Sequence, residues 1–346
     1  MLALRLFGKG DVRLVEVEKP AAGPGEIVLK VGAAAICGTD IRMWQSGKSG
    51  VDENHPLTLG HEFAGTVVEV GPGVPSKYEI GMRLGMQPNI GCGICDMCVS
   101  GRQHLCPDYR AFGINMDGAM AEFVKIPADA ILRGNLIPLG DGVSFEEAAV
   151  AEPLSCAYNG FTKCFVKPGD WALVVGAGPI GAMHAQLLNM AGARVIVNDL
   201  SEERLDMLKA LFPYIETVPG NPAEYVMRKT GGRGLDVAIV ACPVPAVQAA
   251  MLPLMNYGGR VNFFGGVPED RQPVPINTNL VHYKELYLTG STRSSIAQMR
   301  KVVEFAEQGL LDVKGVITHR YPLSDALLAL GNARNAVGIK HVFAFD

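Results

Sequence analysis

Residues 171–199 read WALVVGAGPIGAMHAQLLNMAGARVIVND and carry the clearest structural signal in the chain. The apolar run at 171–175 predicts a buried strand, the glycine-rich turn after it opens a helix, and residues 193–199 predict a second strand. A helical crossover between two strands makes them parallel. The alternation continues through residue 266. We therefore expect an α/β fold with a doubly wound parallel sheet.

The turn contains three glycines, Gly176, Gly178 and Gly181, in the order G-A-G-P-I-G. The first permits a tight turn, the second lets the backbone approach a pyrophosphate, and the third lets the helix pack on the strand. Asp199 ends the next strand, where a carboxylate would bind the adenosine ribose hydroxyls of a dinucleotide. The predicted cofactor site comprises Gly176, Gly178, Pro179, Ile180, Gly181, Asp199, Arg204 and Gly265.

Asp199 also favours NAD over NADP, because a carboxylate would repel a 2′-phosphate. Leu200 and Ser201, which follow it, supply no positive charge. Arg204 lies one helical turn further on. It either stacks on adenine or reaches a phosphate, or it lies on a solvated helix face beside a glutamate. We expect NAD as the cofactor.

The N-terminal part reads as short strands. Residues 26–36, 63–71 and 82–88 are apolar, β-branched runs bounded by Gly, Pro and Asn. They predict a mostly antiparallel, barrel-like arrangement. Residues 144–164 then predict a helix with Ser144 as its N-cap.

The composition limits the class of protein. With 346 residues, 48% of them apolar and 19% charged, the chain suits two globular domains. A net charge of −4 gives no basis for binding nucleic acid or an anionic membrane. No signal peptide and no apolar run long enough to span a bilayer is present. We expect a soluble, cytoplasmic protein without a membrane or nucleic-acid partner.

Four of the eight cysteines lie in one short segment, residues 91–106, which we call the cysteine loop. Its spacing is C-x2-C-x2-C-x7-C, formed by Cys92, Cys95, Cys98 and Cys106. Four thiolates this close can enclose one tetrahedral Zn²⁺ in a closed structural site. An iron–sulfur cluster takes similar ligands and is the alternative.

Three other segments carry candidate metal ligands. Cys37 lies in I-C-G-T-D, His61 and Glu62 lie in L-G-H-E-F-A-G, and Glu152 lies in A-E-P-L. Each has a simpler explanation alone: a small core residue, a hydrogen-bonded pair and a turn residue before proline. The residue types and spacing leave open whether they share a metal.

These motifs, together with D-G-A-M-A-E-F and G-A-G-P-I-G, resemble the zinc-containing medium-chain alcohol dehydrogenase family, specifically its polyol (sorbitol-type) branch, over nearly the whole chain. The resemblance implies a GroES-like catalytic domain formed by residues 1–153 and 294–346, and a Rossmann NAD-binding domain formed by residues 154–293. It also implies that the cleft between them holds zinc and nicotinamide, and that the protein is a homotetramer or homodimer.

The resemblance further implies two Zn²⁺ per chain, one structural and one catalytic. Cys37 and His61 would hold the catalytic ion, and whether Glu62 or Glu152 is the third ligand stays open. An open zinc position would lower the pKa of the hydroxyl of a small alcohol substrate, whose hydride then passes to nicotinamide. Thr39 resembles the hydroxyl of the family's proton relay.

The substrate side departs from the polyol pattern. Arg42 stands where polyol dehydrogenases often have a histidine. It either faces solvent or binds a phosphate or carboxylate of the substrate. Trp44 forms either an apolar wall of the substrate site or part of the core, and Arg293 aligns with a substrate-side arginine of sorbitol-type enzymes.

The expected reaction is oxidation of a secondary hydroxyl of a polyol or sugar-like substrate to a ketone. An L-threonine-type, sugar-phosphate or sugar-acid dehydrogenase on the same scaffold is the alternative. A non-catalytic dinucleotide-binding structural or sensor protein is the alternative of another class, and relatives of that kind usually lack the Cys/His/Glu set.

Overall fold

The computed structural model describes residues 1–345, whose contacts group into two compact units. The first unit contains residues 1–155 and 294–309 and the chain from residue 313 onward, and the second contains residues 156–293 and 310–312. The second unit is therefore an insertion into the first along the chain. Within residues 1–345, no helix combines the length and apolar character that crossing a membrane requires.

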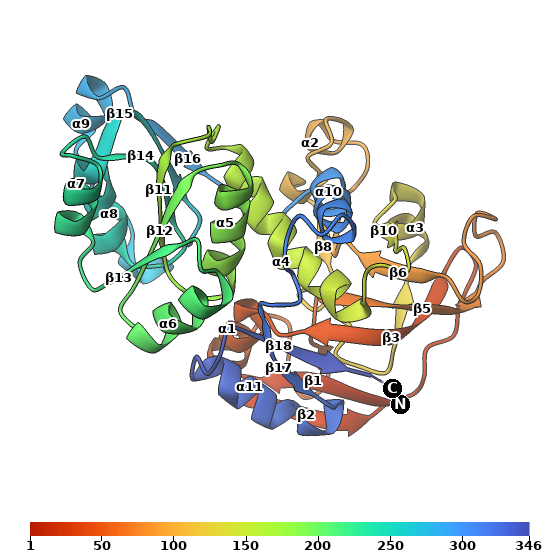
Figure 1. The fold of residues 1–346 in the computed structure, drawn as a ribbon. Helices are drawn as coiled ribbons and strands as arrows, with labels where there is room; N and C mark the ends of the chain where they lie inside the picture. Colours follow the sequence, from red (N-terminus) through yellow and green to blue (C-terminus); the bar gives the residue numbers. More distant parts are fainter. Residues whose placement is uncertain (346) are drawn as a thin grey trace. The chain divides into compact units, whose positions relative to one another are not determined.

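The first unit is built on an extended sheet whose strands follow the order β10-β6-β5-β3-β18-β17, with β9 also paired to β3. The pairing is antiparallel except between β17 and β18. A smaller sheet, β2-β1-β4, lies in the same unit (Figure 1). The strands are β1 (Leu2–Gly8), β2 (Asp11–Glu16), β3 (Ile27–Ala35), β4 (Leu57–Thr58), β5 (Glu62–Val70), β6 (Arg83–Met86), β7 (Asn89–Ile90), β8 (Arg110–Ala111), β9 (Phe123–Ile126), β10 (Leu136–Pro138), β17 (Ile317–Tyr321) and β18 (Lys340–Ala344).

Helices of the first unit carry several of the predicted site residues. They are α1 (Gly38–Ser46), α2 (Asp96–Val99), α3 (Ala128–Arg133), α10 (Ile296–Glu307), α11 (Ala326–Arg334) and the first part of α4 (Phe145–Thr162). The predicted N-cap of α4 is confirmed. The Ser144 hydroxyl accepts the Glu147 N–H at 3.2 Å, and the Glu147 carboxylate accepts the Ser144 N–H at 2.9 Å. This reciprocal pair satisfies two donors at the helix start.

The second unit contains a six-stranded parallel sheet of order β13-β12-β11-β14-β15-β16. This confirms the expected doubly wound sheet. Its strands are β11 (Trp171–Val175), β12 (Arg194–Asp199), β13 (Glu216–Pro219), β14 (Leu235–Val240), β15 (Met255–Phe263) and β16 (Tyr287–Gly290). Its helices are α5 (Pro179–Met190), α6 (Glu202–Leu211), α7 (Ala223–Lys229), α8 (Pro245–Leu254) and α9 (Thr278–Tyr283).

Figure 1 shows α5 and α8 on opposite faces of this sheet. Because both faces are covered, the central strand β11 is buried along its whole length. The strand order reverses between β12 and β14, on either side of β11. In such sheets, ligands bind beyond the carboxyl ends of the strands at this reversal. The glycine-rich turn lies at that position.

Candidate metal centres and cofactor site

The pairing of β3 with β5 brings three predicted metal ligands together. Ala35, at the end of β3, lies opposite Glu62 at the start of β5. Cys37 follows β3 by two residues, and His61 immediately precedes β5. The ligand atoms of Cys37, His61 and Glu62 lie within 4.8 Å of one another. His61 is 8% exposed and Glu62 fully buried.

Asp40, in the first turn of α1, contacts two members of this cluster. Its carboxylate accepts the backbone N–H of Cys37 at 2.8 Å, and its other oxygen lies 3.9 Å from Nδ1 of His61. Asp40 is fully buried, and this burial raises the pKa of its carboxyl group. The carboxylate therefore orients the turn that carries Cys37 and faces the imidazole of His61.

Glu152 lies in α4 directly before Pro153, which has no N–H to donate to the helix ladder. Its carboxylate does not join the 4.8 Å set, although the residue is 5% exposed. Its charge helps to raise the pKa of His61. The backbone carbonyl of Glu152 accepts the Ser155 hydroxyl at 2.6 Å, which fixes this part of the helix.

Sequence analysis missed Lys340, which lies in β18. Its ammonium group is 2.5 Å from the carboxylate of Glu62 and donates to the carbonyl oxygen of Ile36 at 2.8 Å. Burial lowers the pKa of Lys340, but Glu62, Cys37 and Glu152 together outweigh this effect and the net direction is upward. Lys340 is only 2% exposed. The structure therefore places Glu62 in a buried ion pair as well as in the ligand set.

The charges around His61 favour a bound cation. Burial lowers the pKa of His61, but Cys37, Asp40 and Glu152 raise it well above its usual range. Nδ1 of His61 has no hydrogen-bond partner among the described residues. The buried carboxyl groups here are those of Asp40, Glu62 and Glu152, and Cys37 adds a thiol. The buried ammonium group among them is that of Lys340. Sulfur, nitrogen and oxygen donors in a negative pocket are what Zn²⁺ takes in proteins, so the residues fit a zinc ion.

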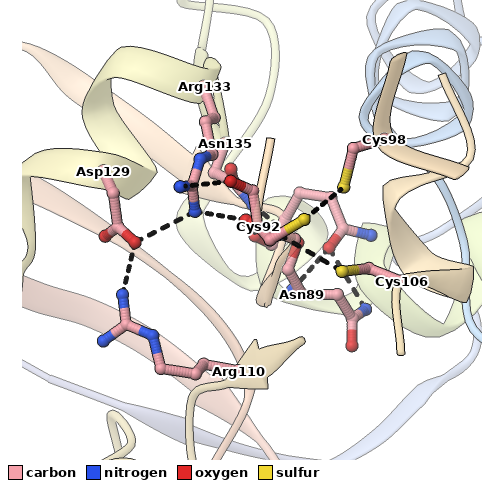
Figure 2. Close-up of polar contacts among 10 residues, drawn as sticks. Asn89, Cys92, Cys98, Cys106, Arg110, Asp129, Arg133 and Asn135 are labelled. Atoms are coloured by element: carbon pink, nitrogen blue, oxygen red, sulfur yellow. Dashed lines mark hydrogen bonds and ion pairs between the residues drawn. The ribbon is translucent and has the colours of Figure 1, made fainter. Parts of the chain in front are cut away.

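The cysteine loop brings its four sulfurs within 4.8 Å of one another. Sγ of Cys92 lies 4.0 Å from Sγ of Cys98 (Figure 2). Sγ of Cys95 lies 3.7 Å from Sγ of Cys106. A Cβ at Gly91 would lie 2.5 Å from Sγ of Cys98, so only glycine lets the loop close this tightly. The geometry is that of a closed four-sulfur metal site.

The pKa values of the cysteine thiols also favour a metal ion in the loop. Backbone N–H groups of Ile94 and Cys95 lower the pKa of Cys92 to about 6, whereas burial raises that of Cys98 to about 12. The protein alone therefore does not hold all four sulfurs as thiolates. A divalent ion that replaces the protons would do so.

The glycine turn has the geometry that the sequence predicts. Gly176 has a φ of +112°, a conformation that L side chains rarely adopt. A Cβ at Gly181 would lie 1.8 Å from the carbonyl oxygen of Gly176, so the start of α5 packs directly on the turn. The carboxylate of Asp199 accepts the N–H groups of Ala177 at 2.6 Å and Ser201 at 2.9 Å.

Two family models match the chain. The alcohol dehydrogenase GroES-like domain matches residues 23–138, and the zinc-binding dehydrogenase matches residues 179–308. The chain is also 33% identical to an L-threonine 3-dehydrogenase of Idiomarina loihiensis over 326 residues, which are 93% of this chain and 92% of that relative. The chain belongs to the zinc-containing medium-chain alcohol dehydrogenase family.

Among solved structures of similar dehydrogenases, one contains NADH and another contains NADP. An alcohol dehydrogenase of Escherichia coli CFT073 in complex with NADH is 25% identical and has a TM-score of 0.87, covering 100% of this chain and 99% of that one. A zinc-binding dehydrogenase of Sinorhizobium meliloti 1021 bound to NADP is 28% identical and has a TM-score of 0.88, covering 99% of both chains. The comparisons support NAD(P) without choosing between NAD and NADP.

The remaining predicted cofactor residues of this dehydrogenase lie at the same edge of the second unit. Nη1 of Arg204 would be 4.0 Å from a Cβ at Gly178, so the guanidinium lies beside the turn. Gly265 packs against the backbone of Cys242, where a Cβ would come within 2.5 Å. Together with Gln248, it lines a shallow hollow of about 570 Å³. Pro179 is the first residue of α5.

The structure gives the three expected substrate residues of the dehydrogenase different surroundings. Arg42 is exposed on α1, where Nη2 lies 3.4 Å from the hydroxyl of Thr39. Trp44 packs against the core, donates its indole N–H to the carbonyl oxygen of Gly10 at 3.2 Å and lies under the guanidinium of Arg334. This geometry favours the core role for Trp44. Arg293 belongs to the second unit.

Sequence analysis also missed a chain of hydrogen bonds that fixes the part of α4 around Glu152. The amide of Gln87 donates to the hydroxyl of Ser294 at 2.8 Å, and that hydroxyl lies 2.6 Å from the hydroxyl of Ser155. Ser155 in turn donates to Glu152. Gln87, Ser155 and Ser294 lie far apart in the sequence and form no motif, so only their shared burial could have indicated them.

Replacing Gly181 by alanine should weaken dinucleotide binding. The added Cβ would overlap the carbonyl oxygen of Gly176, so the turn must move away from the pyrophosphate position. We expect the Kd for NADH, measured by fluorescence titration, to rise by about tenfold or more. Gly331→Ala is the control, because a Cβ there meets nothing within 4 Å and alanine suits the helix α11. Equal Kd values for the two variants would contradict the assignment of the turn.

Proposed function

We propose that the chain is a zinc-dependent NAD(P) dehydrogenase that oxidises the secondary hydroxyl of a small zwitterionic or anionic alcohol, with L-threonine as the first substrate to test. The observation that carries the proposal is the set formed by half-buried Cys37 and buried His61 and Glu62, which the pairing of β3 with β5 brings together. A second metal site in the cysteine loop is structural in this proposal, because four sulfurs leave no open position.

Cys37 and His61 are the proposed ligands of the catalytic ion. Glu62 already neutralises Lys340, so Glu152 is the proposed third protein ligand. This assignment requires the Glu152 carboxylate to move into the set that Cys37 and His61 form. When bound, zinc supplies the Lewis acidity that lowers the pKa of a substrate hydroxyl. Asp40 holds the backbone of Cys37 and faces His61, so it fixes the two ligands that do not move.

Thr39 and Arg42 complete the proposed substrate side. The hydroxyl of Thr39, one residue before Asp40, accepts the proton of the substrate hydroxyl and releases its own towards the nicotinamide ribose, as the family resemblance implies. Arg42 lies within hydrogen-bond distance of that hydroxyl, so its guanidinium is placed to bind an anionic group of the same substrate. Arg293 stays a proposed substrate residue on the strength of the family resemblance.

Two observations favour a carboxylate-bearing substrate over the neutral polyol that the sequence first suggested. The relative from Idiomarina loihiensis carries the name L-threonine 3-dehydrogenase. Arg42 is also exposed beside Thr39, and none of the ion pairs found among the described residues includes it.

Asp199 supports NAD as the preferred dinucleotide. Its carboxylate is held in place by the backbone N–H groups of Ala177, in the glycine turn, and of Ser201, at the N-cap of α6. A fixed negative charge there binds ribose hydroxyls and repels a 2′-phosphate. The expected homotetramer or homodimer and the cytoplasmic location stay predictions.

Arg42→Met should separate substrates by their charge. We expect kcat/KM for L-threonine to fall by about 10- to 100-fold, because a charge-assisted bidentate contact is lost. For 1-amino-2-propanol, which lacks the carboxylate, kcat/KM should change by less than about twofold. The measurement is initial-rate formation of NADH and NADPH by the purified protein, with sorbitol, a sugar phosphate and an aldonic acid in the same panel.

Each outcome of this panel is informative. A preference for L-threonine with NAD supports the proposal in full. Activity on sorbitol alone would restore the polyol interpretation and make Arg42 incidental. Binding of NADH without turnover of any alcohol would contradict an enzymatic function and favour the non-catalytic alternative.

A further inference from the structure

The cysteine loop is held by a side chain outside its ligand set. Arg133, the last residue of α3, donates from Nη2 to the carbonyl oxygen of Cys92 at 2.8 Å and from Nη1 to the carbonyl oxygen of Gly91 (Figure 2). A guanidinium presents its donors in a rigid planar fork. It therefore fixes two successive peptide groups at the point where the loop begins.

Asp129, one turn earlier on α3, connects Arg133 to the other end of the loop. Its carboxylate accepts from Nη1 of Arg133 at 3.0 Å and from Nη2 of Arg110. Arg110 lies in β8, four residues beyond Cys106. Figure 2 shows this carboxylate between the two guanidinium groups. The pairing of Ile90 with Arg110 joins the same two points through the backbone.

The bonds to the backbone distinguish this arrangement from an ordinary surface ion pair. Asp129 and Arg133 have side chains that are 30% and 32% exposed, so their mutual attraction alone is worth little. The carbonyl oxygens of Gly91 and Cys92, by contrast, accept hydrogen bonds from Arg133. These bonds fix the backbone of Cys92, whose N–H contacts Sγ of Cys106, 14 positions later. Because these contacts already hold the two ends of the loop together, the chain loses less conformational entropy when the loop closes around an ion.

We propose that Arg133, oriented by Asp129, is a positioning residue for the metal ion of the cysteine loop. It keeps the Cys92 end of the loop in the closed conformation, so that a ligand that detaches from the ion rebinds before the ion escapes. The proposal rests on the assignment of the four sulfurs to a zinc site and extends it to a residue that does not contact the ion. Loss of such outer partners typically changes metal affinity by about 10- to 100-fold.

The test measures zinc release from the full-length, zinc-loaded protein to an excess of a chromogenic chelator. The phase that belongs to the loop is the one that Cys95→Ser lacks. We expect Arg133→Gln to accelerate this phase by about 10- to 100-fold. Arg133→Lys, which keeps the charge but not the planar fork, should give an intermediate rate. Arg13→Gln is the matched control, because Arg13 also bridges two carboxylates, Asp11 and Glu53, but contacts no part of the loop.

Three results would overturn the proposal. The first is a release rate for Arg133→Gln within about twofold of the parent protein. The second is an equal acceleration by Arg13→Gln, which would indicate general destabilisation. The third is a parent protein without the loop phase, which would remove the metal site itself while leaving the catalytic assignment testable by activity. Should Arg133→Gln fail to fold, the comparison of Arg133→Lys with Arg13→Gln decides in the same way.

Discussion

Replacing His61 by alanine should lower kcat/KM by about 10³- to 10⁵-fold and reduce the zinc content from two ions per chain to one. The expected size follows from losing a Lewis acid that contributes several kcal/mol to the transition state, at about 1.4 kcal/mol per tenfold in rate. His61 is buried, belongs to the ligand set with Cys37 and Glu62, and has Nδ1 3.9 Å from the Asp40 carboxylate. Activity assays and metal analysis on the same preparation give the two readouts.

The matched control for this prediction is His55→Ala. His55 is an exposed histidine that pairs with Asp52 at 3.2 Å, and its loss should change neither activity nor zinc content. The loop ion should remain bound in His61→Ala, because its four ligands lie elsewhere in the unit. A His61→Ala protein that keeps both ions and most of its activity would contradict the catalytic site. Loss of both ions would show that the substitution unfolds the unit.

Replacing Lys340 by methionine should destabilise the first unit by about 3–5 kcal/mol. The substitution leaves the carboxylate of Glu62 fully buried without its counter-charge, which is among the most costly single changes in a protein interior. For a unit of this size, the loss corresponds to a fall in melting temperature of about 6–20 °C. Differential scanning calorimetry of the zinc-loaded protein measures it.

The double variant Glu62→Gln with Lys340→Met tests the cause. Because glutamine carries no charge, the double variant should recover most of the stability that Lys340→Met alone loses. Lys301→Met is the control, since Lys301 pairs with Glu304 on an exposed helix face and should cost about 0.5 kcal/mol or less. A double variant as unstable as Lys340→Met would show that the lysine acts through packing and not through the charge of Glu62.

Local patterns in the sequence predicted the parts of the molecule that depend on neighbouring residues. The turn at Gly176 and Gly181, the cap at Ser144 and the four sulfurs of the cysteine loop each form within a short stretch of chain. The sequence alone indicated that Cys37 and His61 share a site only through the family resemblance. Their proximity depends on the register of β3 against β5, which no local pattern shows.

Lys340 and Ser294 could not be found in the same way. Lys340 lies 304 positions from Ile36, whose carbonyl oxygen it contacts, and it reaches Glu62 only because β18 pairs with β3. In the sequence it is one charged residue at the start of an apolar strand. Strand β15 shows a similar limit. It begins at Met255, directly after α8, because Met255 pairs with Leu235 of β14, a contact that no local pattern shows.

The position of β18 in the sheet has a consequence for biosynthesis. This strand lies between β3 and β17, yet it follows the whole second unit in the chain. The second unit is almost entirely one continuous stretch, so it is complete and able to fold on the ribosome while the first unit still lacks an interior strand. Until that strand is made, Glu62 has no lysine and the buried acidic cluster is unbalanced. The proposed catalytic metal site would therefore gain its full surroundings only after the parallel sheet of the second unit has been made.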